Sequence, residues 1–337
     1  MQLRDLGEFG LIDRIERASR RLGPSRGGAS SGVASSGVAS SGVVLGIGDD
    51  AAILRAGPRE DLVVTTDALV EDVHFRWSSE SPRIVGRRAL VASLSDLAAM
   101  GARPLGFTCA LVAPPDLPLA TFDGLVGGLL REARTHGCPL VGGNLSRGRE
   151  TSLTLTAMGA VTRGRALTRS GVRVGDRICV TGALGAAALD RARAESGLGR
   201  VRRVPAPRLA AGRALGRLRG MGACIDVSDG LEADLGHLLR PSGMAASLDL
   251  AAVPRPPRFS ARCARLGLDP DRLVLAGGED YELLFTLRRR APSACVLSRR
   301  LRVPVAEIGR VTATAPGRGR TSRTSRARER EGGWRHF

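Results

Sequence analysis

Two periodicities of apolar residues divide this chain of 337 residues into helical and extended segments. Apolar residues three and four positions apart predict helices, whereas short runs rich in Val, Leu and Thr predict strands. The predicted helices include 6–22, 82–100, 119–137, 182–194, 209–218, 231–239 and one around 260–267. The main predicted strands are 61–66, 105–112, 139–141, 152–161, 177–181, 246–253 and 275–287. Because the two kinds of segment are mixed rather than strictly alternating, we predict an α+β fold with two α/β domains.

Changes in composition place the boundaries of these domains. The first α/β domain spans 44–165 and the second spans 166–315. The flanking segments are a helix at 1–23, an insert at 24–43, an arginine-rich segment at 316–331 and an aromatic tail at 332–337. The insert contains ASSGV three times in succession, a period too short for a solenoid repeat, so we expect it to be flexible. The arginine-rich segment is expected to be mobile for the same compositional reason.

The composition argues against a membrane protein, a secreted protein and a disulfide-rich protein. Hydrophobic residues make up 43% of the chain, yet no apolar run reaches the length of a membrane span. The N-terminus lacks the basic-then-apolar pattern of a signal peptide, so we expect a cytoplasmic protein without a membrane partner. Six cysteines are spread singly along the chain, mostly in apolar surroundings. This spacing favours buried thiols over zinc ligation or a disulfide framework.

The strong positive charge does not by itself predict a nucleic-acid-binding protein. The formal net charge is +18, and all 51 basic residues are arginine. The lack of lysine excludes a P-loop and Schiff-base chemistry, and it indicates a compositional drift toward arginine. Aromatic residues, at 3%, are too few to stack on single-stranded bases, so we expect no nucleic-acid partner.

Acidic residues follow several of the predicted strands. The segment LGIGDDAAIL, 45–54, turns on its glycines and reaches Asp49 and Asp50. Other such acids are Asp67 after Thr65 and Thr66, Asp226 and Asp229 around Ser228, and Glu279 with Asp280. Asp96 lies inside the apolar predicted helix 82–100. Two like charges about 4 Å apart repel by roughly 4 kcal/mol at an effective dielectric constant near 20, so convergence requires cations. Oxygen ligands favour Mg²⁺ or Ca²⁺, and Mg²⁺ is commonly shared with phosphates.

Structural explanations remain open for each of these residues taken singly. An Asp-Gly pair after a strand is commonly a turn, and Ser228 with Asp229 could cap the following helix. His74, between Val73 and Phe75, could be structural, and Arg169 could be one surface arginine among many. On the phosphate side, the glycine pairs at 142–143 and 277–278 could present backbone N–H groups, and Arg147 or Arg169 could bind phosphate oxygens.

Eight motifs taken together resemble one enzyme family. They occur in order between residues 46 and 337, within a match that runs from about residue 7: GIGDDAAIL, TTDALVEDVHF, SLSDLAAMGARP, GGNLSRG, GRALTRSG, IDVSDGLEADLGH, GGEDYELLF and GWRHF. Each motif alone is weak, but the ordered set resembles thiamine-monophosphate kinase, in the superfamily of aminoimidazole-ribonucleotide synthetase. The resemblance skips only the ASSGV insert and the arginine-rich segment.

The resemblance implies an activity, a fold and a set of site residues. The implied reaction transfers the γ-phosphoryl group of ATP to thiamine monophosphate, the last step of thiamine diphosphate biosynthesis. The implied fold is PurM-like, and the N-terminal domain, the one that binds ATP and Mg²⁺, contributes strands to a barrel at a homodimer interface. The implied ligands of several Mg²⁺ ions are Asp50, Thr65, Thr66, Asp67, Asp96, Asp226 and Asp229. The implied ATP contacts are Gly143, Asn144, Arg169 and Ser228, and the implied thiamine contacts are His74, Glu279 and Trp334.

One position departs from the family pattern. The family usually has Gly-Gly-Asp where this chain has Gly142-Gly143-Asn144, so Asn144 keeps an oxygen but loses a charge that would hold metal. The mechanism is simple in either case, because the acceptor is already a phosphate and needs no general base near neutral pH. We therefore expect catalysis by positioning and charge neutralisation, with no covalent nucleophile.

Related and unrelated functions make different demands on the sequence. A selenophosphate synthetase requires a reactive Cys or selenocysteine near an N-terminal Lys, and a hydrogenase-maturation relative is expected to end on Cys rather than Phe337. A purine-pathway synthetase of the same superfamily remains an alternative. From a different class, a non-catalytic nucleotide- or nucleic-acid-binding protein would retain DNA in a salt-sensitive way without 316–331.

Overall fold

The computed structural model describes residues 43–45, 49–55 and 57–313. The predicted N-terminal helix, the ASSGV insert, the arginine-rich segment and Trp334 lie outside the described residues.

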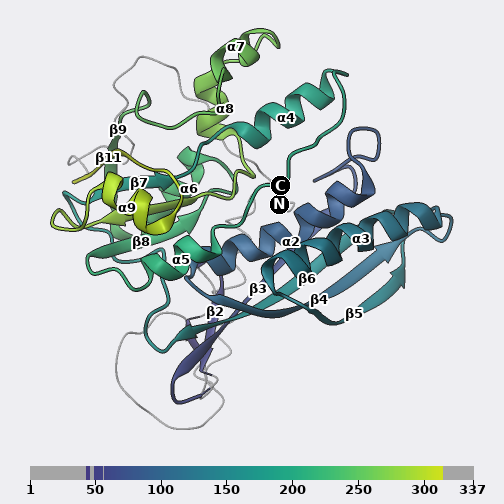
Figure 1. Cartoon of the computed structure of the whole chain (residues 1–337), viewed down its shortest axis with the longest axis horizontal. Coiled ribbons are helices and arrows are strands. Elements are labelled where there is room, and N and C mark those ends of the chain that lie inside the picture. The colour runs from purple at the N-terminus through teal and green to yellow at the C-terminus, as the bar shows by residue number, and fades with distance from the viewer. Residues whose placement is uncertain (1–42, 46–48, 56, 314–337) are drawn as a thin grey trace, which may run out of the picture.

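The first half of the described chain forms a six-stranded sheet in the order β1-β2-β3-β6-β4-β5. Its strands are β1 (Val43–Leu45), β2 (Ala52–Arg55), β3 (Glu60–Val70), β4 (Arg103–Ala113), β5 (Leu140–Arg147) and β6 (Ser152–Thr162). Neighbouring strands are antiparallel except β4 and β5, which run parallel. Helices α2 (Pro82–Ala99) and α3 (Leu119–His136) pack against each other on one face of this sheet (Figure 1). The parallel strand β5 lies at the edge.

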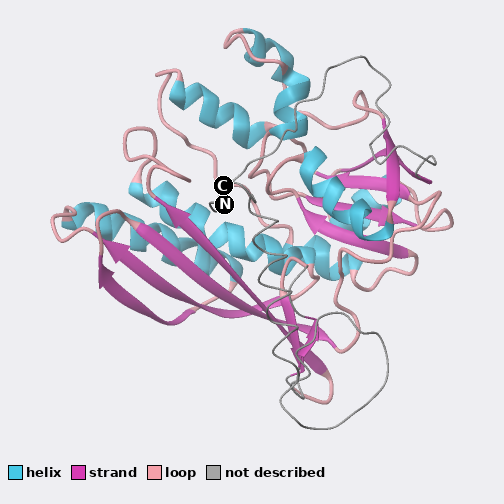
Figure 2. Ribbon diagram, turned by 180° about the vertical axis from the view of Figure 1, so that it is seen from behind, coloured by secondary structure: helices cyan, strands magenta, loops and turns pink. Residues whose placement is uncertain are grey.

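The second half forms a five-stranded antiparallel sheet in the order β8-β10-β7-β11-β9. Its strands are β7 (Arg177–Thr181), β8 (Met221–Asp226), β9 (Met244–Leu248), β10 (Leu283–Leu287) and β11 (Val305–Ala313). The accompanying helices are α4 (Ala186–Glu195), α5 (Leu209–Leu215), α6 (Leu231–Leu239), the short 3₁₀ helix η2 (Arg240–Ser242), α7 (Phe259–Ala264), α8 (Pro270–Ala276) and α9 (Ala294–Leu301). Figure 2 shows the two sheets as separate layers with helices between and around them.

Helix α2 lies between the two sheets. Ser81 caps its first turn by accepting a hydrogen bond from the Ile84 N–H, and Pro82 occupies the first helical position. The helix is apolar on nearly all sides, which is the pattern of a buried helix rather than a surface one. Its residues Leu94 and Leu97 belong to one core cluster together with Phe285 of β10. Polar side chains on such a helix must find partners, and they form the sites described below.

The prediction of an α+β fold is confirmed, as is the helix over 82–100. Two strand boundaries near the site differ. Strand β3 continues beyond Thr66 to Val70, because its pairing with β6 runs on to Ser152. The predicted strand over 275–287 begins only at Leu283, after helix α8. Pairing with neighbouring strands, rather than local polarity, sets where a strand ends. The local pattern therefore predicted β3 too short and β10 too long. Across the described residues, no helix combines the length and apolarity that crossing a membrane requires.

The segment Gly142-Gly143-Asn144 also differs from its predicted place in a loop, because it lies within β5. Gly143 is required by a close approach: a Cβ atom there would lie 2.0 Å from the carbonyl oxygen of Cys109 on β4. The glycine therefore permits the parallel pairing of β4 with β5.

Candidate active site

Three carboxylates from distant parts of the chain meet at one end of α2. Asp50 lies just before β2, Asp96 lies on α2 and Asp226 ends β8, and their carboxylate oxygens lie within 4.8 Å of one another. Two hydroxyl groups donate hydrogen bonds to the cluster. Thr65 Oγ1 lies 2.5 Å from Asp96 Oδ2, and Ser95 Oγ lies 2.6 Å from Asp226 Oδ2. The cluster thus joins both sheets to the helix between them.

The carboxylates of this cluster repel one another. Burial raises the pKa of Asp96 well above its ordinary value, and the charges of Asp67, Asp226 and Asp50 raise it further. Burial and the Asp50 charge likewise raise the pKa of Asp226. The pKa of the adjacent Asp49 rises to about 7 through burial and the Asp50 charge. A bound cation would remove this repulsion, as would protonation.

Asp67 supplies an orphaned ligand atom beside the cluster. It lies inside β3, and its Oδ2 atom is buried without a hydrogen-bond partner. Burial raises the pKa of Asp67, an effect that the nearby Ser93 and Asp96 side chains offset only in part. An orphaned carboxylate oxygen beside three mutually close carboxylates is an all-oxygen donor set, which fits a divalent cation such as Mg²⁺.

Arg169 closes one side of the cluster. Its guanidinium holds Asp50 in bidentate fashion, with Nε 3.1 Å from Oδ2 and Nη2 2.9 Å from Oδ1. The Arg169 backbone N–H donates to Asp49 Oδ2 at 2.9 Å, so Asp49 holds the loop that carries the arginine. Burial alone would lower the pKa of Arg169, but the Asp50 charge raises it above its usual range. Arg169 is therefore a permanent cation placed beside the carboxylates.

The turn after β8 is organised by a single carboxylate oxygen. Asp234 Oδ2 on α6 accepts hydrogen bonds from the backbone N–H groups of Ser228, Asp229 and Gly230, each at 3.1 Å. The cap of α6 is Gly230, without a side-chain hydrogen bond, so the alternative in which Ser228 or Asp229 caps this helix is wrong. Ser228 and Asp229 instead belong to the turn that follows Asp226, and Asp234 fixes the backbone of that turn.

A second group of possible ligands adjoins this turn. Ligand atoms of Asp229, Asp234 and His237 lie within 4.8 Å of one another. Burial and the positive charges of Arg240 and Arg169 lower the pKa of His237 to about 4, so its imidazole is neutral at physiological pH.

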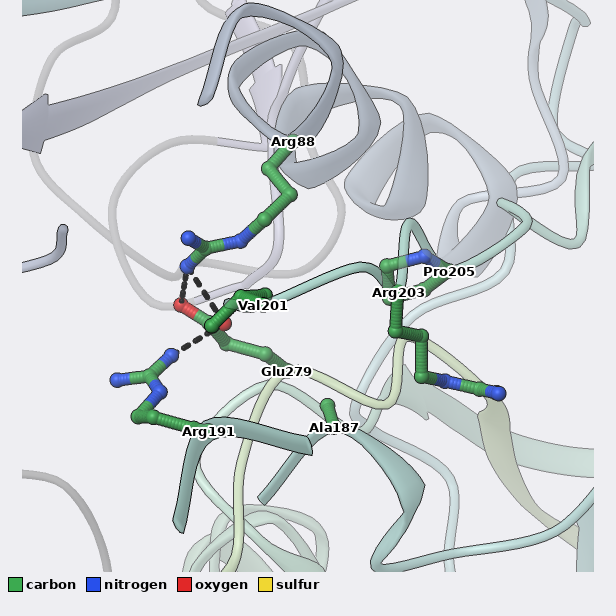
Figure 3. A pocket seen from close by; sticks show the side chains of 7 residues that line it. All are labelled: Arg88, Ala187, Arg191, Val201, Arg203, Pro205 and Glu279. Carbon is green, nitrogen blue, oxygen red and sulfur yellow. Dashed lines mark hydrogen bonds and ion pairs between the residues drawn. The ribbon is translucent and has the colours of Figure 1, made fainter. Parts of the chain in front are cut away.

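Arginine–carboxylate pairs occupy the opposite end of α2. Arg88 Nη2 lies 2.7 Å from both carboxylate oxygens of Glu279 and 3.3 Å from the carbonyl oxygen of His74. Its other terminal nitrogen pairs with Glu80. Arg191 of α4 approaches Glu279 from the other side, as Figure 3 shows. Burial alone would raise the pKa of Glu279, but the two guanidiniums lower it below its usual value, so the carboxylate is ionised.

A small pocket opens beside Glu279. The residues that line it are Arg88, Ala187, Arg191, Val201, Arg203, Pro205 and Glu279. The side chain of Arg203 points away from Glu279 (Figure 3).

Comparisons with known proteins show to which family this chain belongs. Residues 48–161 match the family described as AIR synthase related protein, N-terminal domain. A thiamine-monophosphate kinase of Mycobacterium tuberculosis is 37% identical over 289 residues, which cover 84% of this chain and 81% of that protein. The enzyme of the same name from Escherichia coli K12 is 39% identical, with 82% and 86% covered. The chain belongs to the thiamine-monophosphate kinase family.

Solved structures agree with this membership. A structure described as "AaThiL complexed with AMPPCP and TMP" superposes with a TM-score of 0.78 at 29% identity, covering 100% of this chain and 99% of that one. The thiamine-monophosphate kinase of Stenotrophomonas maltophilia has a TM-score of 0.70 at 36% identity, with 92% and 95% covered. HypE of E. coli, a hydrogenase maturation protein, shares the fold at 22% identity and a TM-score of 0.63.

Within this family framework, the structure brings together most of the predicted metal ligands but not Thr66. Thr65 joins the cluster through its hydrogen bond to Asp96. Because successive side chains of a strand point to opposite faces of the sheet, Thr66 points away from the cluster. Thr66 Oγ1 accordingly bonds the Leu155 carbonyl oxygen at 3.1 Å and lies 3.2 Å from Thr156 Oγ1. Its side chain faces away from α2.

The predicted ATP contacts fall into two places. Arg169 lies at the carboxylate cluster, and Ser228 lies in the turn that begins two residues earlier at Asp226. Gly143 and Asn144 lie on the edge strand β5, where Asn144 Nδ2 donates to Ser146 Oγ at 2.7 Å. Two strands, β6 and β4, separate β5 from β3, which places Asn144 about 14 Å from β3 along the sheet. One ion held by Asp67 is thus out of reach of Asn144 in the same chain.

The predicted thiamine contacts lie near Arg88, except Trp334, which is outside the described residues. His74 Nδ1 accepts the Val70 backbone N–H at 3.1 Å. Glu279 is held by the two arginines described above.

The expectation that Glu279 and Asp280 belong with the cation-binding acids is wrong. Glu279 pairs with arginines, and Asp280 accepts hydrogen bonds from the backbone N–H groups of Gly185 and Ala187, at 3.0 Å for the latter. These N–H groups lie at the start of α4, where a carboxylate is stabilised by the helix dipole. Burial nevertheless raises the pKa of Asp280 to about 6.

Sequence reasoning missed Arg88, Arg191 and Asp234. Arg88 carried a usable signal, because a charged residue on a helix that is apolar on all sides needs a partner, the argument that singled out Asp96. Arg191 and Asp234 lie on helices with polar faces, where nothing in the sequence distinguishes them from solvated residues.

Proposed function

We propose that this protein transfers the γ-phosphoryl group of ATP directly, by in-line displacement, to the phosphate of thiamine monophosphate, giving thiamine diphosphate. The observation that carries the proposal is the convergence of Asp50, Asp96 and Asp226 beside Arg169. Curated relatives are named for this activity, and a similar solved structure holds AMPPCP and TMP.

The residues that would hold Mg²⁺ surround the same end of α2. They are Asp50, Thr65, Asp67, Asp96, Asp226 and Asp229. When bound, Mg²⁺ supplies positive charge that neutralises phosphate oxygens. The orphaned Oδ2 atom of Asp67 and the mutual repulsion of the carboxylates support this assignment.

The protein's own side chains orient the two substrates. Arg169 can exchange its carboxylate partner for phosphate oxygens of ATP, which accept the same bidentate geometry. Ser228 presents its hydroxyl group from the turn that Asp234 organises. Because the acceptor phosphate is nucleophilic without deprotonation, no side chain is needed as a general base.

We further propose that a second copy of the chain pairs along β5 to form the shared barrel of a homodimer. All eight residues of β5 are exposed, including Val141 at 60% and Leu145 at 71%. An unpaired apolar edge strand is a template for another strand. Pairing there would cover these side chains and place Gly143 and Asn144 at the boundary between two subunits, which accounts for their distance from the cluster within one chain.

A direct assay tests the proposed reaction. The purified protein is incubated with ATP, Mg²⁺ and thiamine monophosphate, and thiamine diphosphate is measured by chromatography. We expect product from thiamine monophosphate and none from free thiamine, which serves as the negative control. Absence of thiamine diphosphate, or equal phosphorylation of free thiamine, would overturn the proposal.

A further inference from the structure

One buried guanidinium contacts both described residues that are expected to meet the thiamine part of the substrate. Arg88 is 4% exposed and belongs to α2, in the first half of the chain. It binds both oxygens of Glu279, which precedes β10 in the second half, and the carbonyl oxygen of His74. Glu80 holds the remaining side of the same guanidinium. Arg88 therefore ties the two halves together at this site.

The loop that carries Glu279 adopts an unusual backbone conformation. Glu279 and Tyr281 have φ angles of 63° and 51°, in the left-handed region that non-glycine residues seldom occupy. Backbone hydrogen bonds hold them there, from the Glu279 N–H to the Ser228 carbonyl at 2.7 Å and from the Tyr281 N–H to the Val227 carbonyl at 2.9 Å. The loop thus lies directly against the turn that carries Ser228.

Two further contacts fix the same loop. Gly278 lies so close to that turn that a Cβ atom would come within 2.1 Å of the Ser228 carbonyl oxygen. Tyr281 packs against Val91 and Ala92 of α2, about one turn beyond Arg88. A strained loop persists only where its surroundings determine it, and strain of this kind is concentrated at ligand-binding sites.

The charges around Glu279 are balanced. The carboxylates of Glu80 and Glu279 face the guanidiniums of Arg88 and Arg191. Without Arg88, the two carboxylates would lose the cation between them and repel each other, and the Glu279 side chain would lose both of its 2.7 Å bonds to α2. Arg191 would still bind Glu279, but Arg88 would no longer connect this carboxylate to the His74 carbonyl oxygen.

We infer that Arg88 is the positioning residue for thiamine recognition, holding Glu279 and the His74 backbone in register across the boundary between the two halves. This inference rests on the proposed function. Arg88 acts through Glu279 rather than on the reacting phosphates, which lie at the other end of α2.

Arg208 provides a matched control. It also pairs with a buried carboxylate of the same loop region, Glu282, with Nε 2.6 Å from Oε2, and the pair is bidentate. Among its contacts in the described chain, Arg208 reaches neither His74 nor Glu279. An Arg208→Gln variant therefore removes a comparable ion pair and separates general loss of stability from loss of positioning.

The experiment compares Arg88→Gln and Arg208→Gln with the unmodified protein. We expect Arg88→Gln to raise KM for thiamine monophosphate about tenfold or more, with KM for ATP changed less than about twofold. The Kd for thiamine monophosphate, measured by calorimetry with Mg²⁺ and a non-hydrolysable ATP analogue, should weaken by the same factor. Arg208→Gln should lower the melting temperature and leave both KM values unchanged. Arg88→Lys should restore part of the affinity, because it keeps the charge but not the fork geometry.

Each outcome decides the inference. An unchanged KM for thiamine monophosphate in Arg88→Gln, or an equal rise for both substrates, would overturn it. If Arg88→Gln does not fold, Glu80→Gln decides, because it loosens Arg88 without touching Glu279 and should raise the same KM selectively. If the unmodified protein makes no thiamine diphosphate, the proposed function fails. In that case the Kd for thiamine monophosphate still tests the role of Arg88. Equal Kd values for Arg88→Gln and the unmodified protein, or no binding by either, would overturn that role.

Discussion

Buried carboxylates lie near both Arg88 and Asp96 on α2, but their negative charges are balanced differently at the two places. At the Arg88 end, each buried carboxylate faces a guanidinium of the protein, and the ion pairs are complete. At the Asp96 end, several carboxylates crowd together with Arg169 as their nearby cation. Each end includes a carboxylate that is almost fully buried, Glu80 at 3% exposure and Asp226 at 2%. The difference is therefore one of charge balance rather than of burial.

This contrast separates recognition from chemistry. A complete set of ion pairs keeps side chains in fixed positions, which suits the binding of an organic group. An incomplete set is stabilised when a cation or a proton binds to it, since each pair of like charges about 4 Å apart costs roughly 4 kcal/mol at an effective dielectric constant near 20. That cost supports our proposal that the Asp96 end binds metal and phosphate together.

The largest expected effect comes from removing a charge at the incomplete end. Asp96→Asn should lower kcat by about 100-fold, because Asp96 is central to the cluster and loss of even an outer partner of a metal lowers activity by about 10- to 100-fold. The fold should persist, since an amide can still accept the Thr65 hydrogen bond. Steady-state kinetics and circular dichroism measure the two properties.

Asp123→Asn is the control for this change, because Asp123 is an exposed acid on the neighbouring helix α3. It should leave turnover unaltered. Near-normal activity of Asp96→Asn would remove Asp96 from the metal site.

The next effect should come from the sheet edge. Leu145→Arg places a charge on the exposed strand β5, which should oppose pairing with a second copy and convert a dimer to a monomer. Light scattering after size-exclusion chromatography measures the mass, and Leu119→Arg, an equally exposed leucine outside β5, is the comparison. If Leu145→Arg keeps the mass of the unmodified protein, β5 is not the interface.

A smaller effect is expected from restoring the family residue at the departure. Asn144→Asp adds a carboxylate where the family usually has one, so the Mg²⁺ concentration giving half-maximal rate should fall by about twofold to tenfold. Titration of activity with Mg²⁺ measures this. Identical Mg²⁺ dependence and rate in both proteins would show that position 144 is not a metal site here.

The last expected effect is a change of stability with pH rather than a change of activity. Because the cluster carboxylates have raised pKa values in the metal-free fold, with Asp49 at about 7, the folded state binds more protons than the unfolded state. The free energy of unfolding without metal should therefore be highest at acidic pH and fall through pH 7, by about 1.4 kcal/mol per unit of raised pKa.

Metal reverses this trend, because Mg²⁺ replaces the protons. The rise in melting temperature on adding Mg²⁺ should be larger at about pH 8 than at about pH 5.5. Thermal melts with EDTA or Mg²⁺ provide the measurement, and Asp226→Asn should flatten both slopes. A Mg²⁺ effect that is independent of pH would contradict the assignment of these carboxylates.

The sequence predicted those features in which a residue differs in polarity from its neighbours along the chain. Asp96 stood out because a carboxylate on an apolar helix must have a partner, and α2 itself stood out because its apolar run is long. The same contrast marks Arg88, but arginine is so abundant in this chain that the signal was lost among solvated arginines.

Features that depend on pairing between distant segments could not be predicted. The extension of β3 past Asp67 is set by its register with β6, and the orientation of Thr66 follows from that register. The separation of Glu279 from Asp280 depends on how their loop meets α2 and α4, which no periodicity records. The role of Asp234 likewise required the three N–H groups of the turn to be seen around one oxygen.

Under the proposed function, a single helix that carries both Arg88 and Asp96 would also select substrates by their length. The two residues lie eight positions apart on α2, which corresponds to about 12 Å along the helix axis. A molecule held at the Arg88 end reaches the carboxylates only if it is long enough to span that interval. Thiamine without its phosphate would stop short of the reacting centre, so a rigid helix can discriminate between two molecules whose recognised ends are identical.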